Sequence, residues 1–431
     1  MGSPTPALTP ICGEHRLRLA GGFRRVDSAG ESAGESATKG TTIFMARAAK
    51  YTYLDAATQI ENLGDDIILR QLLRLLEQRS TVTVDVRNVP AWAAEVIEID
   101  PDIAHTSGSF TRKMLAAGLR RRLGRTSEQG YLVLKPGHIG GRYDVKQSLG
   151  RIGLVALTGL CRLLGVGIVR LGFSVDDLKS PLLQIERVQA RLQTVYAPRD
   201  RVSERYARAV GVRTTGRSTD LAYTLGVRGG TTDRSGVVLS FAASTDGHPQ
   251  EDYADRLAAF LKDYLAFLAP TGTAVRYCAQ VVRDAQFGDR VLAGHPQVPR
   301  VAFERTKQTA DAVFQTYSGA ETVLTNRLHS FLFALSQGAV AIVVTDPARH
   351  GKIVGIIQEM GLPELLVSLD GLTPQVLADH VDAVNRDRAR IIGTVRAFFD
   401  AQTRRLESLL DDLLAAPAVT DSMVATDARA A

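Results

Sequence analysis

The fold can be predicted from the stretch Glu321-Thr-Val-Leu-Thr-Asn-Arg-Leu-His-Ser-Phe-Leu-Phe-Ala-Leu-Ser-Gln-Gly-Ala-Val-Ala-Ile-Val-Val-Thr345. A short β-prone run, 322–325, precedes an apolar helical run, 328–337. The wholly apolar run 340–345 then has the length and composition of a buried parallel strand. The stretch therefore predicts a strand, a tight turn, a helix and a second strand of one parallel sheet.

The predicted turn carries three polar side chains, Asn326, Arg327 and His329. In open α/β sheets, ligands bind where parallel strands end, and the N-terminus of a helix at that place favours anions. An amide, a guanidinium and an imidazole at the turn therefore predict a site for an anionic substrate.

Alternating strands and helices extend from this stretch in both directions. We expect a first series of strands near 50–54, 81–86, 131–134, 168–173 and 194–197. We expect a second series near 237–241, 274–281, 301–303, 322–325, 340–345 and 365–369. Because repeated βαβ units build mostly parallel sheets, the predicted fold class is α/β, with two Rossmann-like doubly wound domains facing a cleft.

Changes in composition predict the domain boundaries. Residues 1–44 are rich in Gly, Ser, Ala and Pro and show no sustained apolar period, so we expect disorder there. The remaining boundaries that we expect are 45–222 for the N-terminal domain, 223–236 for a linker, 237–372 for the C-terminal domain, 373–414 for a helical segment and 415–431 for a disordered tail.

Composition also narrows the class of protein. The net charge of +6 over 431 residues is modest and the basic residues are scattered, which argues against a nucleic-acid partner. Three widely spaced cysteines fit a reducing, cytoplasmic location and neither a disulfide framework nor a zinc site. The most apolar region, 152–173, is broken by Arg162 and Arg170, so we expect no membrane-spanning helix.

One group of basic residues leaves a choice open. They could contact anionic lipid at the inner face of a membrane, although a solvated helix face is the commoner explanation. These residues are Arg112, Lys113, Arg120, Arg121 and Arg122.

Structural roles compete with functional ones for several polar residues. Asp65 or Asp66 is a good N-cap for a helix over 67–78, and Arg199 could form a structural ion pair with Asp200. A single histidine at the start of a helix, such as His329, more often caps or packs than catalyses.

Four short motifs and one lysine, which occur in the same order, resemble those of the polysaccharide pyruvyl transferase family. Thr325-Asn-Arg-Leu-His-Ser330 is similar to the family signature Ser-x-Arg-Leu-His-Gly. Asn62-Leu-Gly-Asp-Asp-Ile-Ile-Leu69 resembles Asn-x-Gly-Asp-Glu-x-x-Leu, and Ala197-Pro-Arg-Asp-Arg-Val-Ser203 resembles Val-Arg-Asp-x-x-Ser. Asp220-Leu-Ala-Tyr223 resembles Asp-x-Ala-Phe, and Lys352 lies where the family has a lysine. The ordered set spans roughly residues 50 to 370 and is more specific than any single motif.

The resemblance implies a two-domain enzyme, similar in architecture to GT-B glycosyltransferases. Such an enzyme transfers the pyruvyl group of phosphoenolpyruvate to two hydroxyls of a sugar in a cell-surface glycan or its lipid-linked precursor, and a pyruvate ketal results. On the matching positions, it implies catalysis by His329 and Arg327; donor binding by Arg327, Lys352, Asn326, Ser330 and Arg199; and acceptor binding by Asn62, Gly64, Asp65 and Asp66.

These residue types suit that chemistry. Guanidinium and ammonium groups bind the carboxylate and phosphate of phosphoenolpyruvate, and an imidazole can move protons near neutral pH. The expected partners are phosphoenolpyruvate as co-substrate and a sugar acceptor, and we expect neither a metal nor another cofactor. Two alternatives remain: a GT-B-type nucleotide-sugar glycosyltransferase, in which Arg327 and Lys352 would hold a diphosphate, and a non-catalytic glycan-binding relative.

Overall fold

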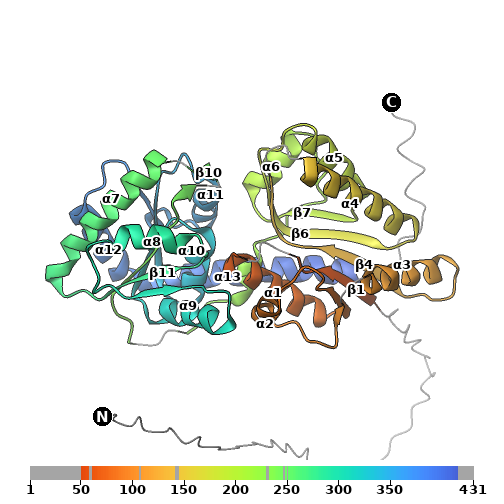
Figure 1. Ribbon diagram of the computed structural model, residues 1–431, viewed down its shortest axis with the longest axis horizontal. Coiled ribbons are helices and arrows are strands. Elements are labelled where there is room, and N and C mark those ends of the chain that lie inside the picture. The colour runs from red at the N-terminus through yellow and green to blue at the C-terminus, as the bar shows by residue number, and fades with distance from the viewer. Residues whose placement is uncertain are drawn as a thin grey trace, which may run out of the picture. The chain divides into compact units, whose positions relative to one another are not determined.

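The computed structural model describes residues 50–57, 61–105, 108–140, 145–229, 233–245, 248–249 and 251–415 (Figure 1). The predicted disordered segment 1–44, nearly all of the predicted tail, residues 230–232 of the predicted linker, and Cys12 lie outside the described residues.

The first sheet is parallel throughout and has the strand order β3-β2-β1-β4-β6-β5, with β7 also paired to β6. Its strands are β1 (Lys50–Asp55), β2 (Thr81–Asp85), β3 (Ala104–His105), β4 (Gln129–Leu134), β5 (Gly137–Ile139), β6 (Gly167–Val175) and β7 (Val195–Pro198). Its helices are α1 (Leu63–Glu77), α2 (Ala91–Ile97), α3 (Ser109–Arg122), α4 (Val145–Leu163), α5 (Leu182–Leu192) and α6 (Arg201–Ala209), followed by a 3-10 helix, η1 (Leu221–Leu225).

The second sheet is also parallel, with the order β12-β11-β8-β13-β14-β15. Its strands are β8 (Val237–Ser240), β11 (Val275–Ala279), β12 (Arg300–Ala302), β13 (Thr322–Thr325), β14 (Val340–Thr345) and β15 (Leu366–Ser368). The helices are α7 (Glu251–Leu268), α8 (Asp284–Leu292), α9 (Lys307–Gly319), α10 (Leu328–Ser336), α11 (Gly351–Met360), α12 (Pro374–Arg386) and α13 (Arg388–Ala415). Two parallel sheets with crossover helices confirm the predicted doubly wound α/β class.

Alternate residues of each strand pack against helices on opposite faces of the sheet, as the strand period requires. In β4, Leu132 and Leu134 join a cluster with residues of α3 and α4, whereas Tyr131 and Val133 join the cluster that contains α1. A strand covered on both faces has to be apolar throughout, which explains the continuous apolar runs in the sequence.

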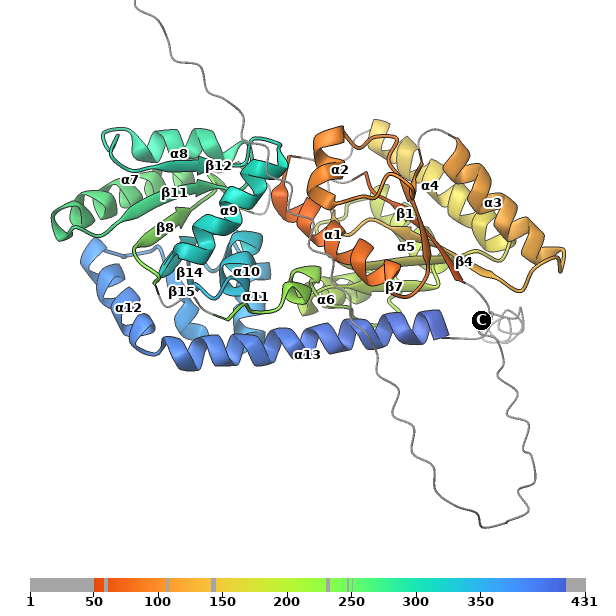
Figure 2. The ribbon, with the colours of Figure 1, turned by 90° about the horizontal axis from the view of Figure 1, so that it is seen from below.

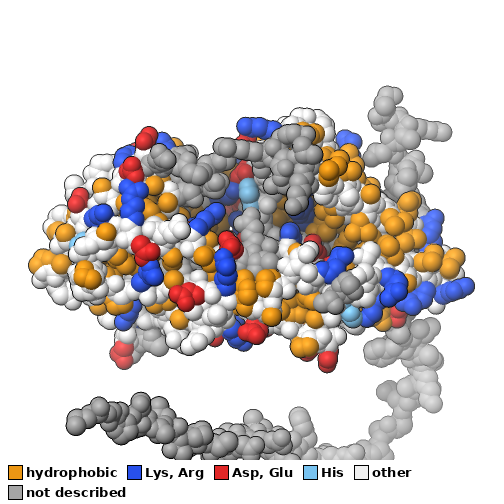
Figure 3. Space-filling view, in the orientation of Figure 1, with side chains coloured by type: hydrophobic (Ala, Val, Ile, Leu, Met, Phe, Trp, Pro, Cys, Tyr) orange, Lys and Arg blue, Asp and Glu red, His pale blue; other side chains and the backbone are white. Residues whose placement is uncertain are grey.

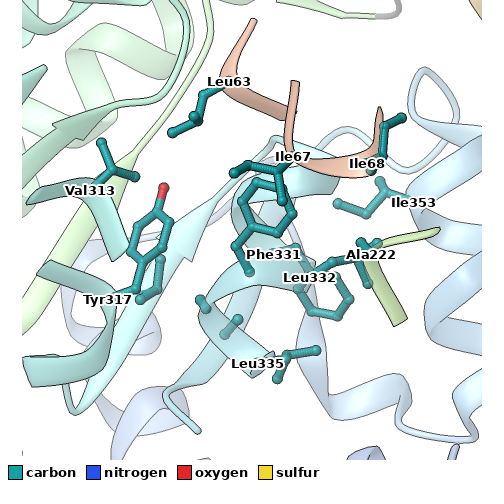
Figure 4. Packing of buried hydrophobic residues seen from close by; sticks show 14 of the residues in the cluster. Leu63, Ile67, Ile68, Ala222, Val313, Tyr317, Phe331, Leu332, Leu335 and Ile353 are labelled. Carbon is teal, nitrogen blue, oxygen red and sulfur yellow. The ribbon is translucent and has the colours of Figure 1, made fainter. Parts of the chain in front are cut away.

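Helices α1 and α10 pack together in one continuous core that contains residues of both sheets. Leu63 and Ile67 of α1 lie beside Phe331 of α10 (Figure 4), and all three side chains are almost fully buried. The N-terminal turns of these two helices are therefore fixed against each other by apolar packing.

The last helix, α13, runs from α12 past α11 and α6 (Figure 2). Its Phe398 and Phe399 make edge-on contacts with the ring of Tyr223. Near its end, the hydroxyl of Tyr131 donates a hydrogen bond of 3.1 Å to the carbonyl of Leu413. The C-terminal helix thus packs on elements associated with both sheets.

Two sequence predictions about helices need correction. Helix α1 begins at Leu63, and its N-cap is Asn62, whose Oδ1 accepts a hydrogen bond of 3.1 Å from the Gly64 amide. Asp65 and Asp66 lie inside the first turn, so the predicted N-cap was wrong. The short helices α2 and α8 were not predicted, because neither has a sustained apolar period.

Within the described residues, no helix is both long and apolar enough to span a lipid bilayer. Cys161 and Cys278 are buried thiols that form no disulfide, and burial raises their pKa to about 11 and about 12, respectively. Both are inert packing residues, because the thiolate is the reactive form.

Candidate functional site

A cavity of about 190 Å³ lies beside the N-termini of α1, α10 and α11, which are helices from both sheets. Seven of the predicted site residues line it: Asn62, Asp65, Arg199, Asn326, Arg327, His329 and Lys352. Gly64, Asp66 and Ser330 do not line it. Residues predicted from three separate motifs and the isolated lysine therefore meet at one place.

The cavity lies at the topological switch point of the second sheet. Strands β8 and β13 are neighbours, and their crossovers run in opposite directions along the sheet. Ala242, just after β8, and Arg327, just after β13, both line the cavity. This is the position at which open α/β sheets bind ligands.

Two helices begin at the cavity without a side-chain cap. The N-cap residues Arg327 of α10 and His350 of α11 make no side-chain capping hydrogen bond. The first backbone N–H groups of a helix have no partner within it and carry the positive end of the helix dipole. Two such N-termini beside one cavity form an environment suited to an anion.

Arg327 is held by a buried carboxylate. Its guanidinium forms an ion pair with Asp284 at the start of α8, and the Asp284 side chain is only 4% exposed. A guanidinium carries five N–H donors, of which a carboxylate engages two at most in a fork. Asp284 therefore orients Arg327 and leaves donors available for a ligand.

Arg199 and Asp220 both lie on the Nε2 side of the His329 ring. Arg199 Nη1 lies 3.0 Å from Asp220 Oδ2 and 3.4 Å from His329 Nε2, and the same carboxylate oxygen lies 3.8 Å from Nε2. Burial alone would raise the pKa of Asp220, but the charge of Arg199, the interaction with His329 and the hydrogen bond from the Ala222 N–H together outweigh it and hold that pKa well below its usual range. An ionised carboxylate therefore lies next to the imidazole, with its Oδ2 3.8 Å from Nε2.

The other side of His329 packs against Gly64 of α1. A Cβ at position 64 would lie 2.8 Å from Cγ of His329 and closer still to Nδ1. The absence of a side chain at Gly64 is thus required for the observed ring position. The ring also stacks on Phe333, with 5.7 Å between ring centroids.

Lys352 belongs to a second charged group. Its Nζ lies 2.5 Å from Asp176 Oδ2 and 3.4 Å from His138 Nδ1, and His138 Nε2 lies 3.2 Å from Asp176 Oδ1. Burial opposes ionisation of Asp176, but the hydrogen bond from His138 and the charge of Lys352 keep its pKa well below its usual range. Strand β5 therefore supplies His138 to the cavity wall.

Asn326 and Ser330 are engaged by other protein groups. The Asn326 amide accepts from the Ala242 N–H at 2.8 Å and donates to the Ala242 carbonyl at 2.9 Å. The Ser330 hydroxyl is fully buried and bonds Gln280 at 2.5 Å and Ser240 at 3.0 Å. These contacts fix the turn after β13, which is the structural role that we assign to both residues.

Asp66 is a fully buried carboxyl, and neither of its oxygens has a hydrogen-bond partner among the described residues. Burial raises its pKa from the usual 3.8 to about 8, and the charge of neighbouring Asp65 adds to the shift. The native carboxyl thus holds a proton that the unfolded chain releases near pH 4. Native protein binds more protons than unfolded protein between about pH 4 and about pH 8, so stability falls as the pH rises through this window.

Asp66→Asn is therefore expected to weaken the dependence of stability on pH between about pH 4 and about pH 8, because the amide does not ionise. The measurement is the melting temperature of the variant and of the parent protein at intervals across that window. Asp263→Asn, at an exposed position of α7, serves as the control and should leave the slope unchanged. If the melting temperatures of Asp66→Asn and of the parent protein changed equally with pH, the raised pKa of Asp66 would be contradicted.

Several residues of the cavity and its surroundings were not predicted from the sequence. Gln280 and Arg283 follow β11, and His350 precedes α11. The carboxylates Asp176 and Asp284 were also missed, because their partners are distant in the sequence. Within the described ranges, no group of three or more His, Cys, Asp or Glu side chains is arranged to hold a metal ion.

Solved structures with similar architecture support a GT-B-like fold. A putative UDP-N-acetylglucosamine 2-epimerase from Listeria monocytogenes has a TM-score of 0.52 and 12% identity, covering 85% of this chain and 97% of that one. HepE from Anabaena in complex with UDP has a TM-score of 0.52 and 13% identity, and the alignment covers 84% of this chain and 99% of HepE. At such low identity these likenesses concern the fold alone. They confirm the predicted similarity to GT-B enzymes.

Sequence comparison gives the family. No match was found among curated proteins. A family model described as polysaccharide pyruvyl transferase matches residues 62–346, which include every predicted site residue except Lys352. With two thirds of its length matched and the motif residues gathered around one cavity, the chain belongs to the polysaccharide pyruvyl transferase family.

Proposed function

We propose that this protein transfers the pyruvyl group of phosphoenolpyruvate to two hydroxyls of one sugar in a cell-surface glycan or its lipid-linked precursor. One observation carries the proposal: the start of α10, with Arg327 and His329, shares a cavity with Arg199 and Lys352. Membership of the family supports modification of a polysaccharide by a transferase. The reducing compartment expected from the cysteines suits a cytoplasmic reaction.

The donor is a small molecule with a carboxylate and a phosphate. The cavity of about 190 Å³ is smaller than the ~300–1,000 Å³ typical of sites for drug-sized ligands, which favours a compact donor. We assign its two anionic groups to Arg327, Lys352 and the uncapped starts of α10 and α11, because forked guanidinium donors and helix N-termini both bind such groups.

The reaction proceeds in two steps on this proposal. A sugar hydroxyl gives up its proton to a base and adds to C2 of phosphoenolpyruvate while a proton is delivered to C3, so the methylene becomes a methyl group. The second hydroxyl then attacks C2, the C2–O bond to phosphate breaks, and the cyclic ketal and inorganic phosphate are released. The second hydroxyl proton leaves with a base or with the phosphate.

His329 is the group to which we assign these proton transfers. Its imidazole lines the cavity and is 11% exposed, so a substrate can reach it. Asp220 and Arg199 hold it from the Nε2 side, and a base held by a third group is the usual arrangement in acid–base catalysis. The positive side chains around C2 stabilise the departing phosphate.

The deciding experiment compares donors. Purified protein is titrated by calorimetry with phosphoenolpyruvate, UDP-glucose and GDP-mannose, and is then incubated with phosphoenolpyruvate and a panel of aryl and lipid-linked glycosides. We expect binding of phosphoenolpyruvate and a ketal adduct detected by mass spectrometry. Binding of a nucleotide sugar, with no binding of phosphoenolpyruvate, would instead establish the glycosyltransferase alternative.

Arg283→Gln tests the donor site without disturbing the core, because Arg283 is exposed and lines the cavity. We expect the KM for phosphoenolpyruvate to rise about tenfold to a hundredfold, as loss of one charge-assisted hydrogen bond predicts, with the melting temperature unchanged. Arg276→Gln, an exposed arginine on β11, provides the matched control. A KM equal to that of the parent protein would remove Arg283 from the donor site.

A further inference from the structure

Exposed large apolar side chains are concentrated on two helices of the first sheet. Among the described residues, eight such side chains are exposed, and six of them belong to α3, its C-cap or α4. The six are Leu119, Leu123, Leu149, Ile152, Leu160 and Leu163, of which Leu163 and Leu149 are 69% and 64% exposed. Single exposed apolar residues are ordinary, but a group of this kind marks an interaction surface.

The apolar residues of α4 form one stripe on its solvent side. Leu149, Ile152, Ala156, Leu160 and Leu163 are all exposed and follow one another at intervals of three or four residues. This spacing places them on a single face of a helix that is nineteen residues long. The opposite side of α4 packs on the sheet through Leu154 and Leu157.

Exposed basic residues lie on α3, and acidic residues are missing from both helices. Neither α3 nor α4 contains an Asp or a Glu. Arg112, Arg120 and Arg125 are exposed on α3 and just beyond its end. Figure 3 shows hydrophobic side chains gathered over the part of the molecule that carries these helices, with Lys and Arg side chains at the edge.

We propose that the surface formed by α3 and α4 docks on a membrane that contains anionic phospholipid. Exposed leucines beside arginines match the apolar interior and negative surface of such a membrane. A nucleic acid would match the charge but not the leucines, since base stacking requires aromatic side chains. The proposal is independent of the pyruvyl transfer proposed above, because docking is measured without phosphoenolpyruvate.

A cavity of about 300 Å³ lies where α3 and α4 meet the ends of β1, β2 and β4. Phe110 of α3 and Leu154 and Leu157 of α4 form its apolar wall, whereas Asp55, Asp85 and Arg87 make its other end polar. The choice of lipid as the occupant therefore rests on the exposed leucines and arginines of the two helices.

The test is co-sedimentation of the full chain with vesicles at low ionic strength. We expect binding to equimolar phosphatidylcholine and phosphatidylglycerol, weaker binding to phosphatidylcholine alone, and loss of binding as salt is added. The triple variant Arg112→Gln, Arg120→Gln and Arg125→Gln is expected to bind the anionic vesicles roughly a hundredfold more weakly, at about fivefold for each charge removed.

A second variant, Leu149→Gln with Ile152→Gln and Leu163→Gln, removes the apolar stripe and should also bind more weakly. The control is Val376→Gln with Arg276→Gln, which removes an exposed apolar side chain and a charge elsewhere. Melting curves establish that each variant is folded. Absence of parent binding to anionic vesicles, or an equal loss in the control, would overturn the proposal.

Light scattering separates lipid from a second copy of this chain as the occupant. If the parent protein is a dimer that fails to bind vesicles, and the leucine variant is a monomer, then the α3–α4 surface is a subunit interface and the proposal is wrong. A dimer interface elsewhere would leave vesicle binding unaffected.

Discussion

His329→Gln is expected to lower kcat for ketal formation by about 10²–10⁴-fold, the usual contribution of a general acid–base group. Glutamine retains hydrogen-bonding capacity toward Arg199 and Asp220 but cannot carry a proton near neutral pH. The KM for phosphoenolpyruvate should change much less, since the anionic groups of the donor are assigned to other residues. Turnover is measured as phosphate release together with the mass of the ketal product.

His295→Gln is the control for that experiment. This residue is partly buried near the end of α8 and does not line the cavity. Its replacement should leave both kinetic constants unchanged. If His329→Gln turned over at the parent rate, the proton would have to come from another group, while the family assignment would stand.

Gly64→Ala should reduce kcat by about 10²-fold, although position 64 carries no reactive group. The added methyl would lie 2.9 Å from Cβ and 2.8 Å from Cγ of His329, so the ring or the first turn of α1 has to move. Displacement of a reacting group by about 1 Å is enough for a loss of that size. The loss should appear in kcat more than in the KM for phosphoenolpyruvate.

The matched control replaces a glycine with open space around it. Gly393 lies on the exposed side of α13, and a Cβ there would meet no atom within 4 Å. Gly393→Ala should keep full activity and stabilise the protein by about 0.5–1 kcal/mol, because alanine loses less backbone entropy in a helix. Full activity in Gly64→Ala would show that His329 does not need this ring position.

Local patterns in the sequence were sufficient for much of the fold. The bounds of β13 and β14 agree with the predicted ranges, because short apolar or β-branched runs are visible in adjacent residues. The start of α1 was predicted several residues late. There the cap is Asn62, and the two following acidic residues are good cap formers as well.

Only those residues of the candidate site that match the family motifs could be predicted from the sequence. Sequence order gave Arg327, His329, Arg199 and Lys352, and the structure places all four around one cavity. The carboxylates that hold Arg327 and Lys352 were not predictable, since the ion pairs with Asp284 and Asp176 depend on the sheet order and not on local spacing. The cationic residues predicted at the site are therefore paired with carboxylates in the structure.

The contacts of α13 have a consequence for synthesis on the ribosome. Tyr131 of β4 bonds to Leu413, which lies 282 residues further along the chain. At ~5–20 residues per second, roughly 15–55 s pass between the translation of these two residues. During this interval the surface around Tyr131 and Tyr223 lacks its covering helix, so the nascent first sheet exposes apolar side chains that chaperones can recognise.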